Sequence, residues 1–71
     1  MKESKLLLKT GQRIRKIRME KNMTQCDLAM LCEFEKASMS RIESGQTNAT
    51  ILTLNKISNA LNVHIADLLR D

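Results

Sequence analysis

The sequence predicts an all-α domain of five short helices, and two observations support this fold class. Residues that interrupt helices or favour strands are scarce, because the 71-residue chain has no proline, two glycines and one aromatic residue, Phe34. Helix-forming residues dominate instead, and apolar residues recur at spacings of three and four. A chain of about 60 residues buries only about 60% of its unfolded surface, so we expect one compact domain over residues 1–71 with a thin core.

Capping residues set the expected limits of the first two helices. The first helix should run from about residue 4 or 5 to residue 21, where Asn22 ends it, because asparagine tolerates the left-handed conformation. Thr24 is the expected N-cap of the second helix, and Asp27 three residues later completes a near-capping box. This second helix should end near Cys32.

Three further helices are expected after a short turn. The third covers residues 36–44, and Gly45 ends it. After a short polar loop, Thr50 caps a fourth helix that ends at Asn62. Residues 63–69 then form one more short helix or turn. No repeat, low-complexity segment or linker divides the chain, which predicts a single bundle.

The predicted core consists of apolar residues at helical spacing, with methionines as filler. A soft-metal or redox function of the methionines would need a cluster of thiolates or histidines beside them, and the sequence shows none, so the methionines are expected to fill the core. The expected core positions are Ile14, Ile17, Leu28, Leu31, Met39, Ile42, Ile51, Leu54, Ile57 and Leu61, together with Met19, Met23 and Met30.

The net charge of +4 is spread unevenly along the chain. Residues 1–23 carry eight Lys or Arg and two acids, a net charge of +6, whereas residues 24–45 carry two bases and four acids, a net charge of −2. A basic excess suits a polyanionic partner such as nucleic acid. A solvated helix face is the commoner explanation of a charge run, so charge alone is a weak indication.

No pattern in the chain predicts an enzyme, a metal site or a cofactor. The sequence shows no carboxylate pair, phosphate-binding loop or catalytic triad. A zinc site needs four grouped ligands. Besides Cys26 and Cys32 the only further His or Cys is His64, which is expected to be a cap or surface residue. The cysteines lack a pairing framework, which predicts reduced thiols and a cytoplasmic protein. No run is long and apolar enough for a membrane span.

The segment ASMSRIESG, residues 37–45, carries the main functional indication. Wound as a helix, it places Met39 and Ile42 on one side as anchors to the core. The opposite arc of about 140° holds small residues and two cations but no acid, whereas a solvated face usually carries acidic partners at i+4 spacing. Such a narrow basic face fits a groove of DNA. Its residues are Lys36, Ala37, Ser40, Arg41 and Ser44.

Residues 23–45, MTQCDLAMLCEFEKASMSRIESG, resemble the helix-turn-helix of the lambda-repressor-like family, of the 434 repressor and Cro type. The shared pattern is the Thr-Gln opening, Leu-Ala three residues on, and Ser-Arg-Ile-Glu-x-Gly, and the likeness extends over roughly residues 9–69. The basic lead-in is also similar to that of the small controllers of restriction–modification operons. Two positions depart from the pattern: Glu33 stands where glycine is usual, and Glu35 where Ser or Thr caps the next helix.

This resemblance implies a helix-turn-helix over about residues 24–44, in which helix 36–44 enters the major groove and the preceding helix crosses the backbone. It also implies that Gln25, Thr47 and Asn48 meet phosphates, although their roles as first-turn and loop residues explain them nearly as well. The full expected DNA-binding set is Thr24, Gln25, Lys36, Ala37, Ser38, Ser40, Arg41, Ser44, Thr47 and Asn48.

Two expectations concern the first helix. By the resemblance, Arg18 should pair with Glu43 and lock the reading helix in place, whereas two unrelated surface charges would contribute under about 1 kcal/mol. The other basic residues of this helix, such as Arg13 and Lys16, have no place on the reading face and should meet phosphates at most.

The predicted function is sequence-specific binding of double-stranded DNA by a homodimeric transcriptional regulator acting on a two-fold operator. Leu52, Ile65 and Leu69 remain after the core is assigned, and they predict a dimer interface with half-sites about 34 Å apart. The alternative is that they close the core of the monomer. Two other functions stay open: an antitoxin that binds a protein partner as well as DNA, and a helical protein-interaction module that does not bind DNA.

Overall fold

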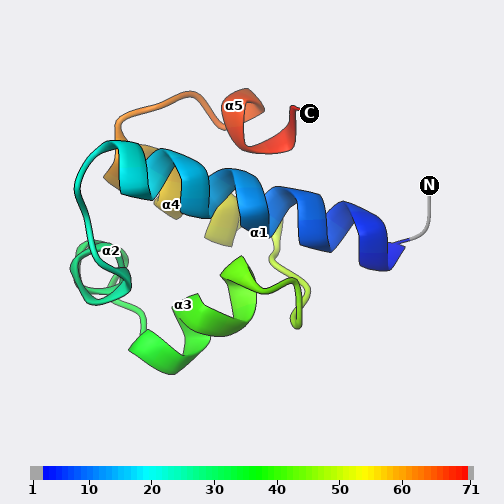
Figure 1. Ribbon diagram of the computed structural model, residues 1–71, viewed down its shortest axis with the longest axis horizontal. Coiled ribbons are helices and arrows are strands. Elements are labelled where there is room, and N and C mark those ends of the chain that lie inside the picture. The colour runs from blue at the N-terminus through cyan, green and yellow to red at the C-terminus, as the bar shows by residue number, and fades with distance from the viewer. Residues whose placement is uncertain (1–2, 71) are drawn as a thin grey trace.

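The computed structural model describes residues 3–70, and within this range it contains five α-helices and no β-strand (Figure 1). The all-α, five-helix fold predicted from the sequence is confirmed. The first four helices begin and end close to the expected limits, whereas the fifth is shorter than expected. The helices are α1 (Glu3–Glu20), α2 (Gln25–Cys32), α3 (Lys36–Glu43), α4 (Ile51–Leu61) and α5 (Ala66–Leu69).

The start of α2 is fixed by the predicted capping box. The Thr24 hydroxyl accepts a hydrogen bond from the backbone N–H of Asp27 at 3.0 Å, and the Asp27 carboxylate accepts one from the backbone N–H of Thr24 at 2.9 Å. The hydrogen bond from the Thr24 backbone N–H, followed by the Thr24 side chain, holds the pKa of Asp27 below its usual value, because it stabilises the ionised carboxylate. The cap therefore satisfies two backbone donors that the helix itself leaves unpaired.

Three of the described helices end close to a left-handed residue other than glycine. Asn22, Glu33 and Asn62 have φ values of 58°, 60° and 57°. The two asparagines tolerate this conformation, as the sequence predicts, whereas Glu33 stands where glycine would be free of strain. Two backbone hydrogen bonds across the end of α2 offset the strain at Glu33, from Glu33 to Met30 at 3.1 Å and from Phe34 to Ala29 at 2.8 Å. The short turn between α2 and α3 is thus held without a glycine.

Helix α1 is the centre of the arrangement. It contacts α3 on one side and α5 on the other, and α4 packs across it, as Figure 1 shows. Helix α2 lies against α3 and α4. Helices α3 and α5 therefore lie on opposite sides of α1, and their exposed surfaces face in different directions (Figure 1).

The core lies where α1, α2, α3 and α4 meet, and α5 closes it with one residue, Leu68. The buried hydrophobic residues are Ile14, Ile17, Leu28, Ala29, Cys32, Met39, Ile42, Leu54, Ile57, Leu61 and Leu68.

Four predicted core positions are wrong. Met19, Met30, Leu31 and Ile51 are between 56% and 77% exposed. In α2 the buried side is centred on Leu28, Ala29 and Cys32, and at 100° per residue Leu31 points about 105° away from that centre. In α4 the buried side is set by residues of the second and third turns, and Ile51 at its first position lies beside that stripe. Two of the predicted methionines do serve the core: Met39 is buried, and Met23 packs against it.

Helices α1 and α3 approach so closely that only a glycine fits between them. A Cβ atom on Gly11 would lie 2.6 Å from the carbonyl oxygen of Ile42 and closer still to that of Glu43. Real Cβ atoms do not make such contacts with backbone atoms, and a backbone cannot move aside as a flexible side chain can. Gly11 therefore sets the distance between α1 and α3.

A buried ion pair joins the same two helices and confirms the predicted contact between Arg18 and Glu43. Arg18 donates to both carboxylate oxygens of Glu43, from Nε to Oε2 at 2.7 Å and from Nη2 to Oε1 at 3.1 Å. The two side chains are only 9% and 2% exposed. Arg18 Nη1 also donates to the backbone carbonyl of Met23 at 2.6 Å, just before α2. The guanidinium is thus satisfied on three sides and links α1, α3 and the start of α2.

Replacing Gly11 by alanine tests the close contact of α1 with α3. At an exposed helical position this change would stabilise the fold by up to about 1 kcal/mol, because alanine favours helix more than glycine. At Gly11 we expect destabilisation of about 1–3 kcal/mol, because the added methyl group pushes the helices apart. Urea denaturation of Gly11→Ala beside Gln12→Ala, an exposed neighbour, measures the difference. A Gly11→Ala protein as stable as the parent would contradict the contact.

Replacing Glu43 by glutamine tests the buried pair. The change keeps the shape of the side chain but leaves the Arg18 charge buried without its partner, and we expect a loss of about 3–5 kcal/mol. Glu20→Gln, at an exposed carboxylate, is the matched control and should change stability by less than about 0.5 kcal/mol. Thermal and urea denaturation of both variants give the comparison, and equal melting of Glu43→Gln and the parent would refute a structural role for the pair.

Candidate nucleic-acid interface

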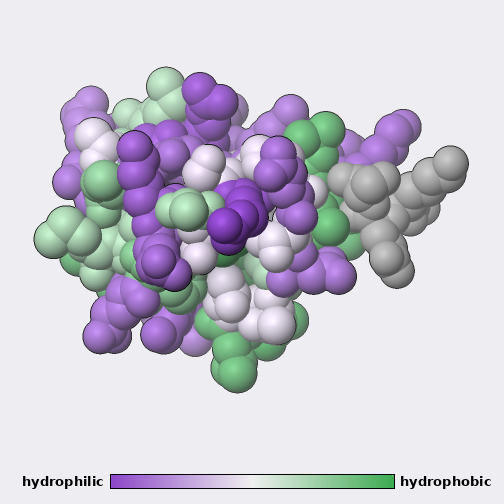
Figure 2. Space-filling model, turned by 90° about the horizontal axis from the view of Figure 1, so that it is seen from below, coloured by the Kyte–Doolittle hydropathy of each residue, from purple (hydrophilic) through white to green (hydrophobic). Residues whose placement is uncertain are grey.

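The exposed side of α3 is the surface that the sequence predicts. Met39 and Ile42 are buried, and all five residues of the predicted arc, Lys36, Ala37, Ser40, Arg41 and Ser44, are exposed. Figure 2 views the molecule from the α3 side, where strongly hydrophilic atoms lie next to near-neutral ones. The helix therefore presents a polar, narrow face to solvent while its opposite side is held in the core.

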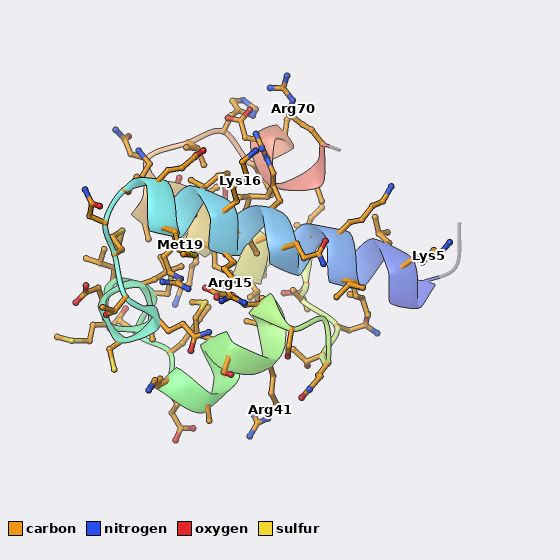
Figure 3. All side chains as sticks on the ribbon, viewed as in Figure 1. Lys5, Arg15, Lys16, Met19, Arg41 and Arg70 are labelled. Carbon is orange, nitrogen blue, oxygen red and sulfur yellow. The ribbon has the colours of Figure 1, made fainter. Side chains whose placement is uncertain are left out.

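The two cations of this face are available to a ligand. Arg41 projects away from the body of the molecule on the side opposite to α1 (Figure 3). Within residues 3–70, neither the Lys36 nor the Arg41 side chain has a hydrogen bond or an ion pair. A guanidinium without an internal partner keeps its full set of donors for an acceptor outside the protein.

Two serines of the predicted set are less available than expected. Ser38 is half-buried. Ser44 is exposed, but α3 ends at Glu43 rather than at residue 44, and Ser44 is its C-cap. The Ser44 hydroxyl donates to the backbone carbonyls of Ser40 at 2.9 Å and Arg41 at 3.2 Å. Its hydrogen is therefore used by the helix end, and only its oxygen lone pairs remain for a ligand.

Gln25 at the start of α2 is connected to α3 through Glu43. Its side-chain Nε2 donates to Glu43 Oε1 at 3.0 Å. A carboxylate only accepts hydrogen bonds, so the amide must present its NH2 group, and one of the two N–H bonds stays available for another acceptor. Glu43 thus holds Arg18 and Gln25 together. The sequence does not reveal this contact, because residues 18 positions apart on different helices share no local pattern.

The remaining predicted phosphate contacts lie at the two ends of the helix-turn-helix. Thr24 is exposed, and its oxygen accepts the capping hydrogen bond while its hydroxyl proton stays available. Thr47 is half-buried and Asn48 is exposed, both in the loop between α3 and α4 (Figure 1). The loop follows Gly45, whose left-handed backbone (φ 76°) passes close to Leu8 of α1.

The basic residues of α1 do not share this face. Arg13 donates from Nε to the backbone carbonyl of Asp67 in α5 at 2.9 Å, and Lys16 lies on the same side of α1, near Arg70 (Figure 3). This is the side away from α3. Arg13 and Lys16 are therefore absent from the exposed face of α3, as expected. That they contact phosphates stays a prediction, and a duplex lying against α3 would be on the other side of α1.

Of the predicted dimer residues, two are exposed and one is not. Leu52 is 76% exposed and Leu69 is 48% exposed, whereas Ile65 is half-buried and packs against the core. Leu52 and Leu69 are thus apolar side chains that the described part of the chain leaves uncovered. For Ile65 the alternative prediction, that these residues close the core of the monomer, holds in part, since Ile65 packs against that core.

The metal-ligating and thiol side chains of the described residues lie apart from one another. Between residues 3 and 70, no three His, Cys, Asp or Glu side chains form a group that could hold a metal ion. Cys26 is exposed, and Cys32 is buried between helices, where burial raises the pKa of its thiol. In the described residues no helix has the length and apolar character needed to cross a membrane.

The comparison with protein families matches residues 14–68 to the helix-turn-helix family HTH_3. Control protein C.BamHI of Bacillus amyloliquefaciens is 43% identical over 60 residues, which cover 83% of this chain and 74% of that protein.

Solved structures agree. The restriction-modification controller protein C.AhdI from Aeromonas hydrophila has a TM-score of 0.85 at 32% identity, over 87% of this chain and 94% of that chain. The clp gene regulator ClgR from C. glutamicum has a TM-score of 0.87 at 26% identity, over 90% and 83% of the two chains. The family model spans the predicted helix-turn-helix and the core around it. The chain belongs to the HTH_3 helix-turn-helix family and is a DNA-binding transcription regulator of the XRE type.

Proposed function

We propose that this regulator binds a two-fold DNA site as a homodimer and reads the major groove with α3. The observation that supports this most directly is the exposed, acid-free face of α3, whose other side is fixed by the Arg18–Glu43 pair. The likeness to control proteins of restriction–modification systems supports such genes as the regulated ones. We also propose that it acts in the cytoplasm, where its two free cysteines would stay reduced.

The residues of α3 divide by what their side chains offer to a base pair. Arg41 can donate two parallel hydrogen bonds to O6 and N7 of guanine, and Lys36 can reach a guanine or a phosphate. Ala37 offers a methyl contact to thymine, and Ser40 can donate or accept. Ser38 and Ser44 border this group, with Ser44 limited to accepting.

A second group contacts the phosphates and sets the register of the protein on DNA. The start of α2 offers the free N–H of the Gln25 amide, the Thr24 hydroxyl and the first backbone N–H groups of the helix, which favour an anion. Thr47 and Asn48 contact the backbone from the other end of α3. Glu43 positions the Gln25 amide and therefore influences binding without touching DNA.

The dimer forms through the uncovered leucines. Leu52 at the start of α4 and Leu69 at the end of α5 are large, exposed and apolar, and a second copy would remove them from water. Ile65 contributes its exposed part at the edge. Two copies of α3 would then meet half-sites about 34 Å apart, one turn of the duplex.

Two substitutions of Arg41 separate base reading from charge. Arg41→Ala should weaken binding to the preferred site by about 1–3 kcal/mol and relax the choice of base at one position per half-site. Arg41→Lys keeps the charge but loses the planar fork, so it should keep affinity for random duplex and still lose the base preference. The measurement is titration of each variant against the site selected from a random pool, its single-base variants and random duplex.

Lys16→Ala is the control for Arg41, because Lys16 lies on the other side of α1 and should not change binding to a short duplex that carries a single operator. If Arg41→Ala weakens all duplexes equally and keeps the base preference, Arg41 holds only the backbone and the assignment of the reading residue is wrong.

Charge at the uncovered leucines should prevent dimer formation. Leu52→Glu and Leu69→Glu each place a carboxylate in the proposed interface, so sedimentation should show monomers at concentrations where the parent is dimeric. Both side chains are exposed, so the fold should remain intact. Met30→Glu, at an equally exposed apolar residue of α2 (77%), is the control and should stay dimeric. A parent protein that is monomeric at high micromolar concentration, with and without DNA, would contradict the dimer.

A further inference from the structure

A second basic surface lies on α1 and α5. It consists of Lys5, Lys9, Arg13 and Lys16, which recur every three or four residues along α1, and Arg70 just after α5. We call it the α1–α5 basic face. Four of these residues line an open hollow of about 310 Å³ together with Gln12, namely Lys9, Arg13, Lys16 and Arg70. Figure 3 shows Lys16 and Arg70 close to each other above α1.

This face points away from α3. Gly11 and Arg18 mark the side of α1 that touches α3. At 100° per residue, Lys9, Arg13 and Lys16 lie about 140–180° around the helix from Arg18. Figure 3 agrees, since Arg41 projects from the opposite side of the molecule to Lys16 and Arg70. A straight duplex bound to α3 therefore cannot reach the α1–α5 basic face of the same protomer.

Within residues 3–70, part of the charge of this face is left without an ionic partner. The carboxylates of Asp67 and Glu20 lie beside the face. Asp67 is already paired with Arg70 at 3.0 Å, and its backbone carbonyl accepts the hydrogen bond from Arg13 Nε. Arg13 lines the hollow, and its two terminal NH2 groups make no hydrogen bond within residues 3–70. Lys16 has no hydrogen bond or ion pair within residues 3–70. Such a concentration of positive charge attracts a polyanion.

We propose that the α1–α5 basic face binds a second DNA duplex through its phosphates, without preference for sequence, so that one protein assembly holds two DNA segments. The composition of the face favours DNA over an acidic protein. Protein interfaces are depleted in lysine and gain most of their affinity from buried aromatic or arginine anchors, and this face has three lysines and no aromatic residue. Phosphate contacts need only exposed Lys and Arg side chains.

The proposal rests on the proposed function in one respect, because α3 must be occupied by the first duplex. The test uses the full chain and a short immobilised duplex that carries the selected site, so that every α3 is engaged. A fluorescent random duplex of the same length is then added over a salt series. The wild-type protein should retain the second duplex, and retention should fall steeply with salt.

The test variant is Lys5→Gln/Lys16→Gln/Arg70→Gln, which changes exposed side chains and leaves Arg13 bonded to α5. It should bind the immobilised site as the wild type does, melt at the same temperature, and lose the second duplex, with a salt slope lower by about two to three units. Lys16→Gln alone should lower the slope by about one unit, whereas Lys21→Gln, the same charge change at an exposed position beyond α1, should not.

Each other outcome overturns the proposal. The face carries no DNA if the triple variant retains the second duplex as well as the wild type, or if the wild type retains none. A second duplex lost in Arg41→Ala but kept in the triple variant would be held by α3 of an additional protein molecule. Retention of polyglutamate in place of the second duplex would assign the face to an acidic protein. Failure of the proposed function shows separately, as a lack of site preference in the single-duplex titration.

Discussion

The position of α3 depends on the carboxylate of Glu43. It accepts hydrogen bonds from Arg18 of α1 and Gln25 of α2, and it belongs to α3, so one buried charge joins three helices. Removing two charges from water is costly, and only a complete set of partners offsets that cost. The same geometry that makes the pair tolerable also fixes α3, because the Arg18 guanidinium is planar and directional. Gly11 adds a limit on distance, since main chain meets main chain there.

This constraint matters because α3 cannot stabilise itself. It has eight residues, and isolated helices shorter than about 12–15 residues are marginal in water. Its N-cap, Glu35, makes no side-chain capping hydrogen bond. Order in α3 therefore comes from Met39 and Ile42 in the core and from Glu43 in the ion pair. Because those three residues do this on one side, the other side is free to carry exposed polar and basic residues, and the rigid scaffold keeps them in place.

Local chemistry made much of this structure predictable. Thr24 and Thr50 mark helix starts in the sequence, and Asn22, Gly45 and Asn62 mark helix ends. These positions are predictable because caps depend on residues a few positions apart. The exposed polar face of α3 could be predicted for the same reason, since helical spacing places its residues on one side. The exposure of Leu31 and Ile51 could not be predicted, because periodicity gives the apolar side of a helix but not how much of that side a neighbour covers. Contacts such as Gln25 with Glu43 join separate helices and leave no trace in spacing.

The burial of Leu68 has a consequence for how the chain folds as it is made. Leu68 is completely buried and follows every other core residue in the chain, while α1, the first helix to be synthesised, supplies Ile14 and Ile17 to the same core. At about 5–20 residues per second, the ribosome needs about 2–9 s to add the residues that separate the end of α1 from α5. During that time the apolar side of α1 has no complete cover. The core is therefore completed only after α5 has been made. Until then α1 is incompletely covered and could be bound by a nascent-chain chaperone.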